Sequence, residues 1–230
     1  MLLKKWDELP DFMRNEEVKP YYDVLKTKKF QLKVKRLFDI VCSLFLIILL
    51  STILIVVAIW IKIDSRGPIF YRQERVTQYG EIFRIIKFRT MVVNADQMGT
   101  LVTIQNDSRI TKVGEKIRKC RIDEIPQLFN VFLGDMTFVG TRPEVKKYVD
   151  AYTNEMYATL LLPAGVTSLA SIMFKDEDAF FSLHDKKNKT IDDVYVNEIL
   201  PIKMEYNLKG VSSFYFIDDI KIMFNTVMRV

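Results

Sequence analysis

Two adjacent carboxylates, Asp123 and Glu124, lie in the stretch RIDEIPQLFN, inside an otherwise basic part of the chain. Pro126 follows closely, and because proline is tolerated only in the first turn of a helix, a helix is predicted to begin near the pair. The free N–H groups and the positive dipole end at a helix start stabilise carboxylates and attract phosphate. Taken alone, the pair favours a helix cap, since Asp is a preferred capping residue and Glu suits the first turn.

The basic residues around the pair favour chemistry over a cap. The stretch RITKVGEKIRKCR, residues 109–121, contains six basic residues and one acid. Lys87 and Arg89 in KFR and Arg142 in GTRPE add further cations. Two carboxylates can supply oxygen ligands to Mg²⁺ while cations bind phosphate oxygens, and a carboxylate can also attack phosphorus to form an acyl phosphate. The pattern therefore predicts chemistry on a phosphorylated substrate held with a divalent metal ion.

An uncharged run, Ile40–Ile61, precedes this site and has the length of a membrane helix. It begins too far from the first residue for a signal peptide. Basic residues flank it on both sides: Lys28, Lys29, Lys33, Lys35 and Arg36 before it, and Lys62, Arg66, Arg72 and Arg75 after it. Because basic flanks favour the cytoplasmic side, both ends are expected there, and the segment is predicted to enter the membrane, bend and return through the same face.

Periodicity predicts the elements that hold the site. The stretch GPIFYRQERVTQYGEIFRIIKFRTM predicts a β-hairpin with its turn at residues 78–80. Helices are predicted in TKVGEKIRKC and in PQLFNVFLGDM. Apolar residues recur at spacings of four and three in and before the second helix and are expected to line one face of it: Ile125, Phe129 and Phe132.

A further helix is predicted in the C-terminal stretch FIDDIKIMFNTVMRV. Its apolar residues share one face: Ile217, Ile220, Phe224 and Val227. That face fits a helix of the core, and it fits equally a helix lying in the membrane interface with Lys221 and Arg229 toward the head groups. Both alternatives stay open from the sequence.

The composition narrows the class of partner. A net charge of +5 is compatible with nucleic acid, anionic lipid or a phosphorylated small substrate. No zinc-finger, RNP or helix-turn-helix signature is present, so nucleic acid is not expected, and basic residues beside a membrane segment are typical of lipid contact. Two cysteines give no disulfide framework. The single histidine, His184, has no second histidine for a zinc site and is expected to be a surface residue, which leaves catalysis to carboxylates.

The predicted fold class is α+β: a mainly helical, small cytosolic domain with a short β-hairpin. One N-terminal re-entrant membrane helix and interfacial amphipathic helices are expected to anchor it. The expected divisions are an N-terminal lead-in at residues 1–34, a membrane-inserted helix at 35–66, and a catalytic domain at 67–230, at the membrane interface.

Six motifs stand in a fixed order from Lys35 to the C-terminus: KRLFDI, IKIDSRGPIFYRQERV, KFRTM, NDSRITKVG, IRKCRIDEIPQLFNVFLGDMTFVGTRPE and LLPAGVTS. In these motifs the chain resembles the bacterial sugar transferases, or monotopic phosphoglycosyl transferases, which start capsule, exopolysaccharide and glycoprotein glycan assembly. A lone Asp-Glu pair is a weak signal, whereas six ordered motifs are highly specific.

The resemblance implies a two-step, Mg²⁺-dependent reaction at the bacterial inner membrane, with the catalytic domain on the cytoplasmic face. Asp123 would attack the β-phosphorus of a UDP-sugar and release UMP, and undecaprenyl phosphate would then take the phosphosugar. Glu124 would help to hold Mg²⁺ or manage the proton. Neither the sugar nor a homodimer is decided by the residues.

Eight residues are expected to contact the substrate: Lys87, Arg89, Arg109, Arg118 and Arg142, together with Pro163, Gly165 and Thr167 of the stretch PAGVTS, which is expected to be a loop near the nucleotide or sugar. Departures from the family pattern occur at three places. Ser51-Thr52 replaces Ser-Pro in the membrane helix, Thr141 replaces a proline, and Ala164 and Ser168 alter the last motif. The alternative function is a membrane-tethered basic interaction protein without catalysis, whose two acids are caps.

Overall fold

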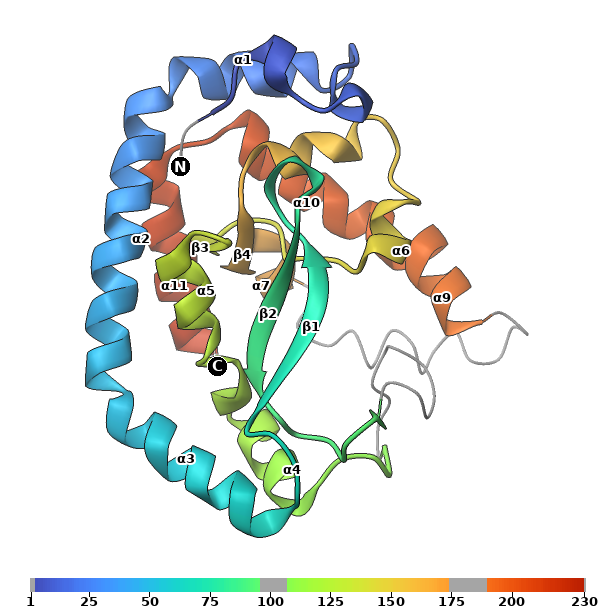
Figure 1. Cartoon of the computed structure of the whole chain (residues 1–230). Coiled ribbons are helices and arrows are strands. Elements are labelled where there is room, and N and C mark those ends of the chain that lie inside the picture. Colours follow the sequence, from blue (N-terminus) through green and yellow to red (C-terminus); the bar gives the residue numbers. More distant parts are fainter. Residues whose placement is uncertain (1–2, 96–106, 174–189, 230) are drawn as a thin grey trace.

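The computed structural model describes residues 3–95, 107–173 and 190–229 (Figure 1). His184 lies outside the described residues. The elements, in chain order, are η1 (Trp6–Glu8), η2 (Asp11–Met13), α1 (Lys19–Thr27), α2 (Lys29–Leu49), α3 (Ser51–Asp64), β1 (Phe70–Val76), η3 (Gln78–Gly80), β2 (Ile82–Phe88), α4 (Lys112–Lys119), η5 (Ile122–Glu124), α5 (Gln127–Leu133), β3 (Met136–Val139), α6 (Lys146–Val149), η6 (Met156–Leu161), β4 (Ala164–Thr167), α7 (Leu169–Met173), α9 (Ile191–Val194), η8 (Tyr195–Ile199), α10 (Leu200–Ser212) and α11 (Phe216–Arg229). The predicted class, a mainly helical α+β fold, is confirmed.

The apolar run folds as two helices. Helices α2 and α3 meet at Leu50 and are bent by 60°. Within the described residues no single helix is both long and apolar enough to cross a membrane. The two arms of this bent pair, taken together, have the length and composition to do so. The bend falls at Ser51, where the sequence has no proline, and the two arms form the long left side and the lower edge of the molecule in Figure 1.

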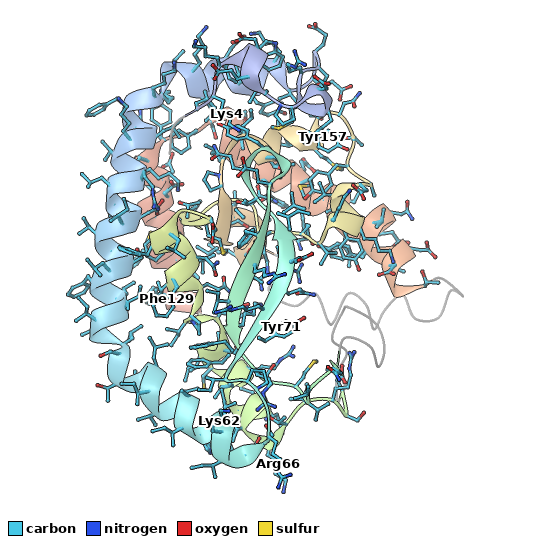
Figure 2. All side chains as sticks on the ribbon, viewed as in Figure 1. Lys4, Lys62, Arg66, Tyr71, Phe129 and Tyr157 are labelled. Atoms are coloured by element: carbon cyan, nitrogen blue, oxygen red, sulfur yellow. The ribbon has the colours of Figure 1, made fainter. Side chains whose placement is uncertain are left out.

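One face of the bent pair packs on the body and the other is exposed. Side chains such as Phe38, Leu46 and Leu50 are partly buried against a core formed by β2, α5 and β3. The large exposed apolar side chains of the pair are Phe30, Leu37, Val41, Leu44, Phe45, Ile48, Leu49, Ile53, Ile55, Val56, Ile59, Trp60 and Ile63. An exposed apolar surface of this extent marks a surface for lipid or protein. Lys62 and Arg66 stand at the far end of α3 (Figure 2).

The N-terminal residues pack into the largest core cluster. Leu9, Met13 and Val18 are almost fully buried, together with Leu161 of η6 and Met204 of α10. Helix α1 accordingly lies along α10 at the top of Figure 1. The first 30 or so residues therefore stabilise the body that carries the site.

The hairpin prediction is confirmed. Strands β1 and β2 pair antiparallel, with Phe70 opposite Phe88 and Val76 opposite Ile82, around a turn at Gln78–Gly80. Positive φ angles at Tyr79 and Gly80 close this turn.

A second sheet was not predicted. Strands β3 and β4 pair in parallel, with Met136 opposite Ala164 and Val139 opposite Thr167. The stretch PAGVTS was expected to be a loop, and residues 164–167 of it are instead β4. The pairing needs glycine, because a Cβ at Gly165 would lie 2.2 Å from the carbonyl oxygen of Gly140.

The apolar residues expected to line one face of the second helix are not its most buried ones. Leu128 and Val131 are its buried apolar residues, whereas Ile125 and Phe129 are half-buried and Phe132 is 37% exposed. The physical reason is that α5 begins only after Pro126. The preceding residues form a separate 3₁₀ turn, and a 3.6-residue period does not run through it.

The C-terminal helix exposes the apolar face found in its sequence. Ile217, Phe224 and Val227 are 62, 65 and 76% exposed and Ile220 is half-buried, whereas Asp219 on the opposite face is buried. The core alternative therefore does not hold for the three exposed residues, which add to the exposed apolar surface of α2 and α3.

Candidate active site

The acid pair lies in a short turn between two helices. Residues Ile122–Glu124 form the 3₁₀ turn η5, entered through Arg121 in the left-handed region at φ 51°. Neither η5 nor α5 has a side-chain capping hydrogen bond. The two carboxylates are therefore not caps in the structure, and both are available for another role.

Glu124 is held between two cations. Its Oε1 accepts hydrogen bonds from Lys87 Nζ at 2.8 Å and from Arg142 Nη2 at 2.6 Å. Burial alone would raise the pKa of Glu124, but Arg142 and Lys87 outweigh it and hold that pKa well below the usual range. The position of Glu124 is thus set by two ion pairs, which favour its ionised form.

Asp123 has the opposite electrostatic balance. Burial and the neighbouring charge of Glu124 raise the pKa of Asp123, and Lys87 and Arg118 offset this only in part. Arg118 is half-buried on α4 and makes no ion pair with a described residue. Adjacent carboxylates with pKa values pushed apart are typical of sites in which the two groups have different roles.

The hairpin brings Lys87 to the pair. Lys87 stands near the end of β2, and burial lowers its pKa while Glu124 opposes that shift. Asn130 of α5 holds β2 in place, because its Nδ2 donates to Arg84 O at 2.9 Å and its Oδ1 accepts from Ile86 N at 2.9 Å. Asn130 therefore fixes the distance between the helix after Glu124 and the strand that carries Lys87.

The second sheet brings Arg142 to the pair. Gly165 N donates to Thr141 O at 2.8 Å and Gly140 N donates to Thr167 O at 3.0 Å, so β4 shapes the loop that carries Arg142. Pro163 is buried behind this loop. Gly165 and Thr167, two of the three residues expected near the substrate in PAGVTS, therefore help to position Arg142 through backbone hydrogen bonds to its loop.

Glu144 anchors the same loop from the other side. This carboxylate is 6% exposed and accepts a hydrogen bond from the Tyr195 hydroxyl. Lys203 Nζ lies 3.0 Å from that hydroxyl and 3.7 Å from Glu144 Oε1. Sequence reasoning missed Glu144, although it directly follows the Arg142-Pro143 motif.

Two predicted site residues have their described contacts elsewhere. The Arg89 guanidinium donates to three backbone carbonyls after α3, at Ser65, Arg66 and Pro68, over 2.7–3.0 Å. Arg109 pairs with Asp107 at 2.6 Å. The structure therefore brings Lys87, Arg118 and Arg142 to the acids, and gives Arg89 and Arg109 other described partners.

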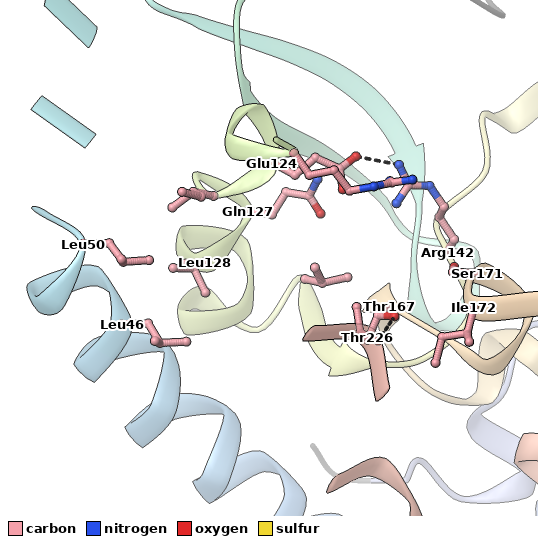
Figure 3. Close-up of a pocket in the computed structure, with 13 residues that line it drawn as sticks. Leu46, Leu50, Glu124, Gln127, Leu128, Arg142, Thr167, Ser171, Ile172 and Thr226 are labelled. Atoms are coloured by element: carbon pink, nitrogen blue, oxygen red, sulfur yellow. Dashed lines mark hydrogen bonds and ion pairs between the residues drawn. The ribbon is translucent and has the colours of Figure 1, made fainter. Parts of the chain in front are cut away.

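A cavity of about 300 Å³ opens beside Glu124 (Figure 3). Its lining residues are Leu46, Leu50, Arg121, Glu124, Ile125, Gln127, Leu128, Arg142, Val166, Thr167, Ser171, Ile172 and Thr226. The Glu124–Arg142 ion pair lies at one end, and Leu46 and Leu50 bring the bend of the apolar helix pair to the other. Thr167 and Thr226 share a hydrogen bond at 2.8 Å in its wall. Of these lining residues, sequence reasoning predicted Glu124, Arg142 and Thr167 as site residues and missed the others, among them Gln127, whose only signal was a polar residue three positions after Glu124.

The donor set fits a substrate-completed magnesium site. Among the described residues no group of three or more His, Cys, Asp or Glu side chains could hold a metal. Mg²⁺ is commonly bound by one or two carboxylates together with substrate phosphates, so Asp123 and Glu124 are sufficient protein ligands for such a site.

The model of the family described as bacterial sugar transferase matches residues 30–230. The chain belongs to the bacterial sugar transferase family. Among the curated relatives of this sugar transferase, the UDP-N-acetylgalactosamine-undecaprenyl-phosphate N-acetylgalactosaminephosphotransferase of Aeromonas hydrophila is 40% identical over 144 residues, covering 61% of this chain and 34% of that protein. The UDP-glucose:undecaprenyl-phosphate glucose-1-phosphate transferase of Klebsiella pneumoniae is 33% identical over 198 residues, covering 85% of this chain and 39% of that protein.

The undecaprenyl-phosphate galactose phosphotransferase of Salmonella typhimurium is 36% identical over 160 residues, which cover 63% of this sugar transferase and 33% of that protein. The chain therefore spans about a third to two fifths of the length of these three relatives. Their names carry three different sugars, so similarity to them does not select one for this family member.

Proposed function

We propose that this sugar transferase moves a sugar 1-phosphate from a UDP-sugar to undecaprenyl phosphate, with release of UMP. The observation that carries the proposal is the Asp123–Glu124 pair, with Glu124 held by Lys87 and Arg142, beside a cavity that reaches the bend of an apolar helix pair. The family and the names of its relatives support both substrates. The reaction would begin the assembly of a capsule, exopolysaccharide or other glycan.

In the proposed reaction the two acids have different roles, and Asp123 is the nucleophile. A carboxylate oxygen of Asp123 attacks the β-phosphorus, and the bond from that phosphorus to the α,β-bridging oxygen breaks, so that UMP leaves with the electron pair. A phosphate oxygen of undecaprenyl phosphate then attacks the same phosphorus, and the Asp123 carboxylate is released. Each step exchanges one P–O bond for another, and the covalent intermediate divides one difficult transfer into two.

The cations act on the charge of the phosphates. Arg118 lies near Asp123 and forms no ion pair with a described carboxylate, so it is suited to bind phosphoryl oxygens. Lys87 and Arg142 hold Glu124 ionised, which makes it a poor proton acceptor and a good metal ligand. Mg²⁺ bound by Asp123 and Glu124 would neutralise charge on the transferring group.

The exposed apolar faces support a location at a membrane. Helices α2, α3 and α11 expose large apolar side chains, and basic residues stand at both ends of the bent pair. We place the pair in the inner membrane, entering and leaving on the cytoplasmic side, where UDP-sugars are available. A membrane-embedded lipid phosphate and a soluble nucleotide sugar can then meet at one site.

UMP release tests the proposal. The purified protein is incubated with Mg²⁺, undecaprenyl phosphate and a panel of UDP-sugars, beside Asp123→Asn and the surface control Asp150→Asn, which removes an exposed carboxylate paired with Lys146. Release by the parent and the control but not by Asp123→Asn supports the transferase and identifies the sugar. No release with any sugar, together with retained binding to liposomes, would favour the membrane-tethered interaction protein.

A further inference from the structure

Gln127 carries an unusual feature in the cavity. Its side chain is 1% exposed, and neither its amide nitrogen nor its amide oxygen has a hydrogen-bond partner among the described residues. Buried polar atoms are nearly always hydrogen-bonded, and leaving one without a partner is costly. Asn130, one turn later on the same helix, uses both ends of its amide and is equally buried. The missing bonds are therefore particular to Gln127.

The position of Gln127 indicates what completes those bonds. Gln127 lies in the first turn of α5, and its side chain lies beside Glu124 in the cavity wall (Figure 3). Its amide offers two N–H donors, and phosphate oxygens are strong acceptors. A phosphate that enters the cavity beside the Glu124–Arg142 ion pair would reach an unused donor there.

The walls of the cavity favour the lipid over the nucleotide as the source of that phosphate. The apolar part of the cavity wall consists of Leu46, Leu50, Ile125, Leu128, Val166 and Ile172. Of the other polar lining residues, Thr167 and Thr226 are hydrogen-bonded to each other and Ser171 is hydrogen-bonded to Ser168, so these hydroxyls are already engaged. A uracil, a ribose and a sugar need many hydrogen-bond partners, whereas a prenyl chain needs none and fits the apolar part of the wall. Leu46 and Leu50 stand at the end of α2, next to the exposed apolar surface, so the chain would leave the cavity toward the membrane.

We propose that Gln127 binds the phosphate of undecaprenyl phosphate, and that the cavity between α2, α5 and α11 holds the first prenyl units of this substrate. The proposal rests on the proposed transferase function. Asp123 is not part of the cavity lining, so the nucleotide sugar would approach the acid pair from the Arg118 side and the lipid from the Gln127 side.

Steady-state kinetics with Gln127→Met tests this inference. Methionine keeps the length of the side chain and removes both polar ends. The expected result is a roughly tenfold rise in KM for undecaprenyl phosphate, the size of one hydrogen bond to a charged group, with KM for the UDP-sugar unchanged. The melting temperature is expected to stay the same or rise, because the free protein loses no hydrogen bond. Gln127→Glu places a negative charge beside the phosphate and is expected to raise KM for the lipid further.

Asn130→Leu is the matched control on the same helix. It removes an amide that is hydrogen-bonded at both ends, so it is expected to lower the melting temperature. It is also expected to lower kcat/KM for both substrates together. The inference is overturned if Gln127→Met leaves both KM values unchanged, raises KM for the UDP-sugar instead, or lowers activity only in step with a lower melting temperature. A parent protein that releases no UMP from any UDP-sugar overturns the proposed function itself, so the two failures are distinguishable.

Discussion

The ammonium group of Lys35 on α2 lies 2.6 Å from the carboxylate of Asp219 on α11, and both side chains are almost completely buried. Lys35 Nζ also donates to Val139 O of β3 at 2.8 Å. On the next turn of α2, Asp39 accepts a hydrogen bond from Thr137 Oγ1 at 2.8 Å. The KRLFDI motif thus joins the apolar helix to the body through a polar contact inside the core.

Replacing Lys35 by methionine is expected to lower the free energy of unfolding by roughly 3–5 kcal/mol, because it leaves Asp219 as a buried charge without its partner. Denaturant titration of the detergent-solubilised protein measures this. Lys33→Met, two residues earlier and exposed, is the control and is expected to change stability by less than about 0.5 kcal/mol. A similar loss in both variants would contradict the assignment of the ion pair.

The acid limb of the pH–activity profile is expected to report Asp123. Burial and Glu124 raise the pKa of Asp123, so activity should fall with decreasing pH at a pH above the ordinary range of an aspartate. Lys87 favours the ionised form of Asp123, so Lys87→Met is expected to move this limb to higher pH as well as to lower the rate. The measurement is kcat/KM for the UDP-sugar as a function of pH.

Lys119→Met is the control for that profile, because Lys119 is an exposed cation paired with Glu115. Its acid limb is expected to coincide with that of the parent. An acid limb that keeps its position in Lys87→Met would show that Lys87 does not influence the ionisation on which activity depends.

Glu124 is expected to contribute to the stability of the fold in a pH-dependent way. Its folded-state pKa is depressed below the unfolded value, so its stabilising contribution is present above the unfolded pKa and is lost as pH falls through the folded one. Comparison of Glu124→Gln with the parent over the acidic range checks this. The difference in melting temperature between the parent and Glu124→Gln should shrink as the pH falls toward the folded-state pKa of Glu124. A difference that stays constant would argue against a depressed pKa.

Arg89 and Arg142 are expected to respond differently to conservative replacement. Arg142→Lys disturbs the ion pair with Glu124, so kcat/KM should fall about 10- to 100-fold with little change in stability. Arg89→Lys removes donors to the carbonyls after α3, so the melting temperature should fall while KM for the UDP-sugar stays unchanged. A selective rise in KM in Arg89→Lys would instead place Arg89 at the substrate.

Cysteine labelling is expected to find both ends of the bent pair on the cytoplasmic side. Lys35 is unsuitable as a probe because it is buried, whereas Lys33 and Lys62 are exposed. Single cysteines at these two positions are introduced after replacement of the native Cys42 and Cys120 by alanine. Labelling by a membrane-impermeant reagent should require permeabilised cells at both positions, and labelling from opposite sides would show that the pair crosses the membrane.

The parts of the fold that were predictable depend on neighbours in sequence. The hairpin around Gln78–Gly80 follows from alternation and a local turn, and the acid pair stands in the same stretch of sequence as Arg118. The pairing of β3 with β4 was not predictable, because it depends on the close approach of Gly140 and Gly165 from distant parts of the chain.

The assignment of individual cations shows the same limit. Lys87 and Arg89 are two residues apart on one motif, yet one contacts Glu124 and the other holds the loop after α3. Their separation depends on which tertiary neighbours each side chain meets. The unpaired amide of Gln127 is likewise a property of its surroundings, which the residue type alone does not predict.

The 60° bend between α2 and α3 has a mechanical consequence for the bilayer. Helix α3 has 14 residues, a length of about 21 Å at 1.5 Å per residue, which is short of the roughly 30 Å hydrocarbon layer. A pair that enters and leaves through one face adds area to a single leaflet. In the proposed re-entrant topology the pair therefore adds volume to the cytoplasmic monolayer alone, and lipids with small head groups, which leave space at that depth, are expected to accommodate it most readily.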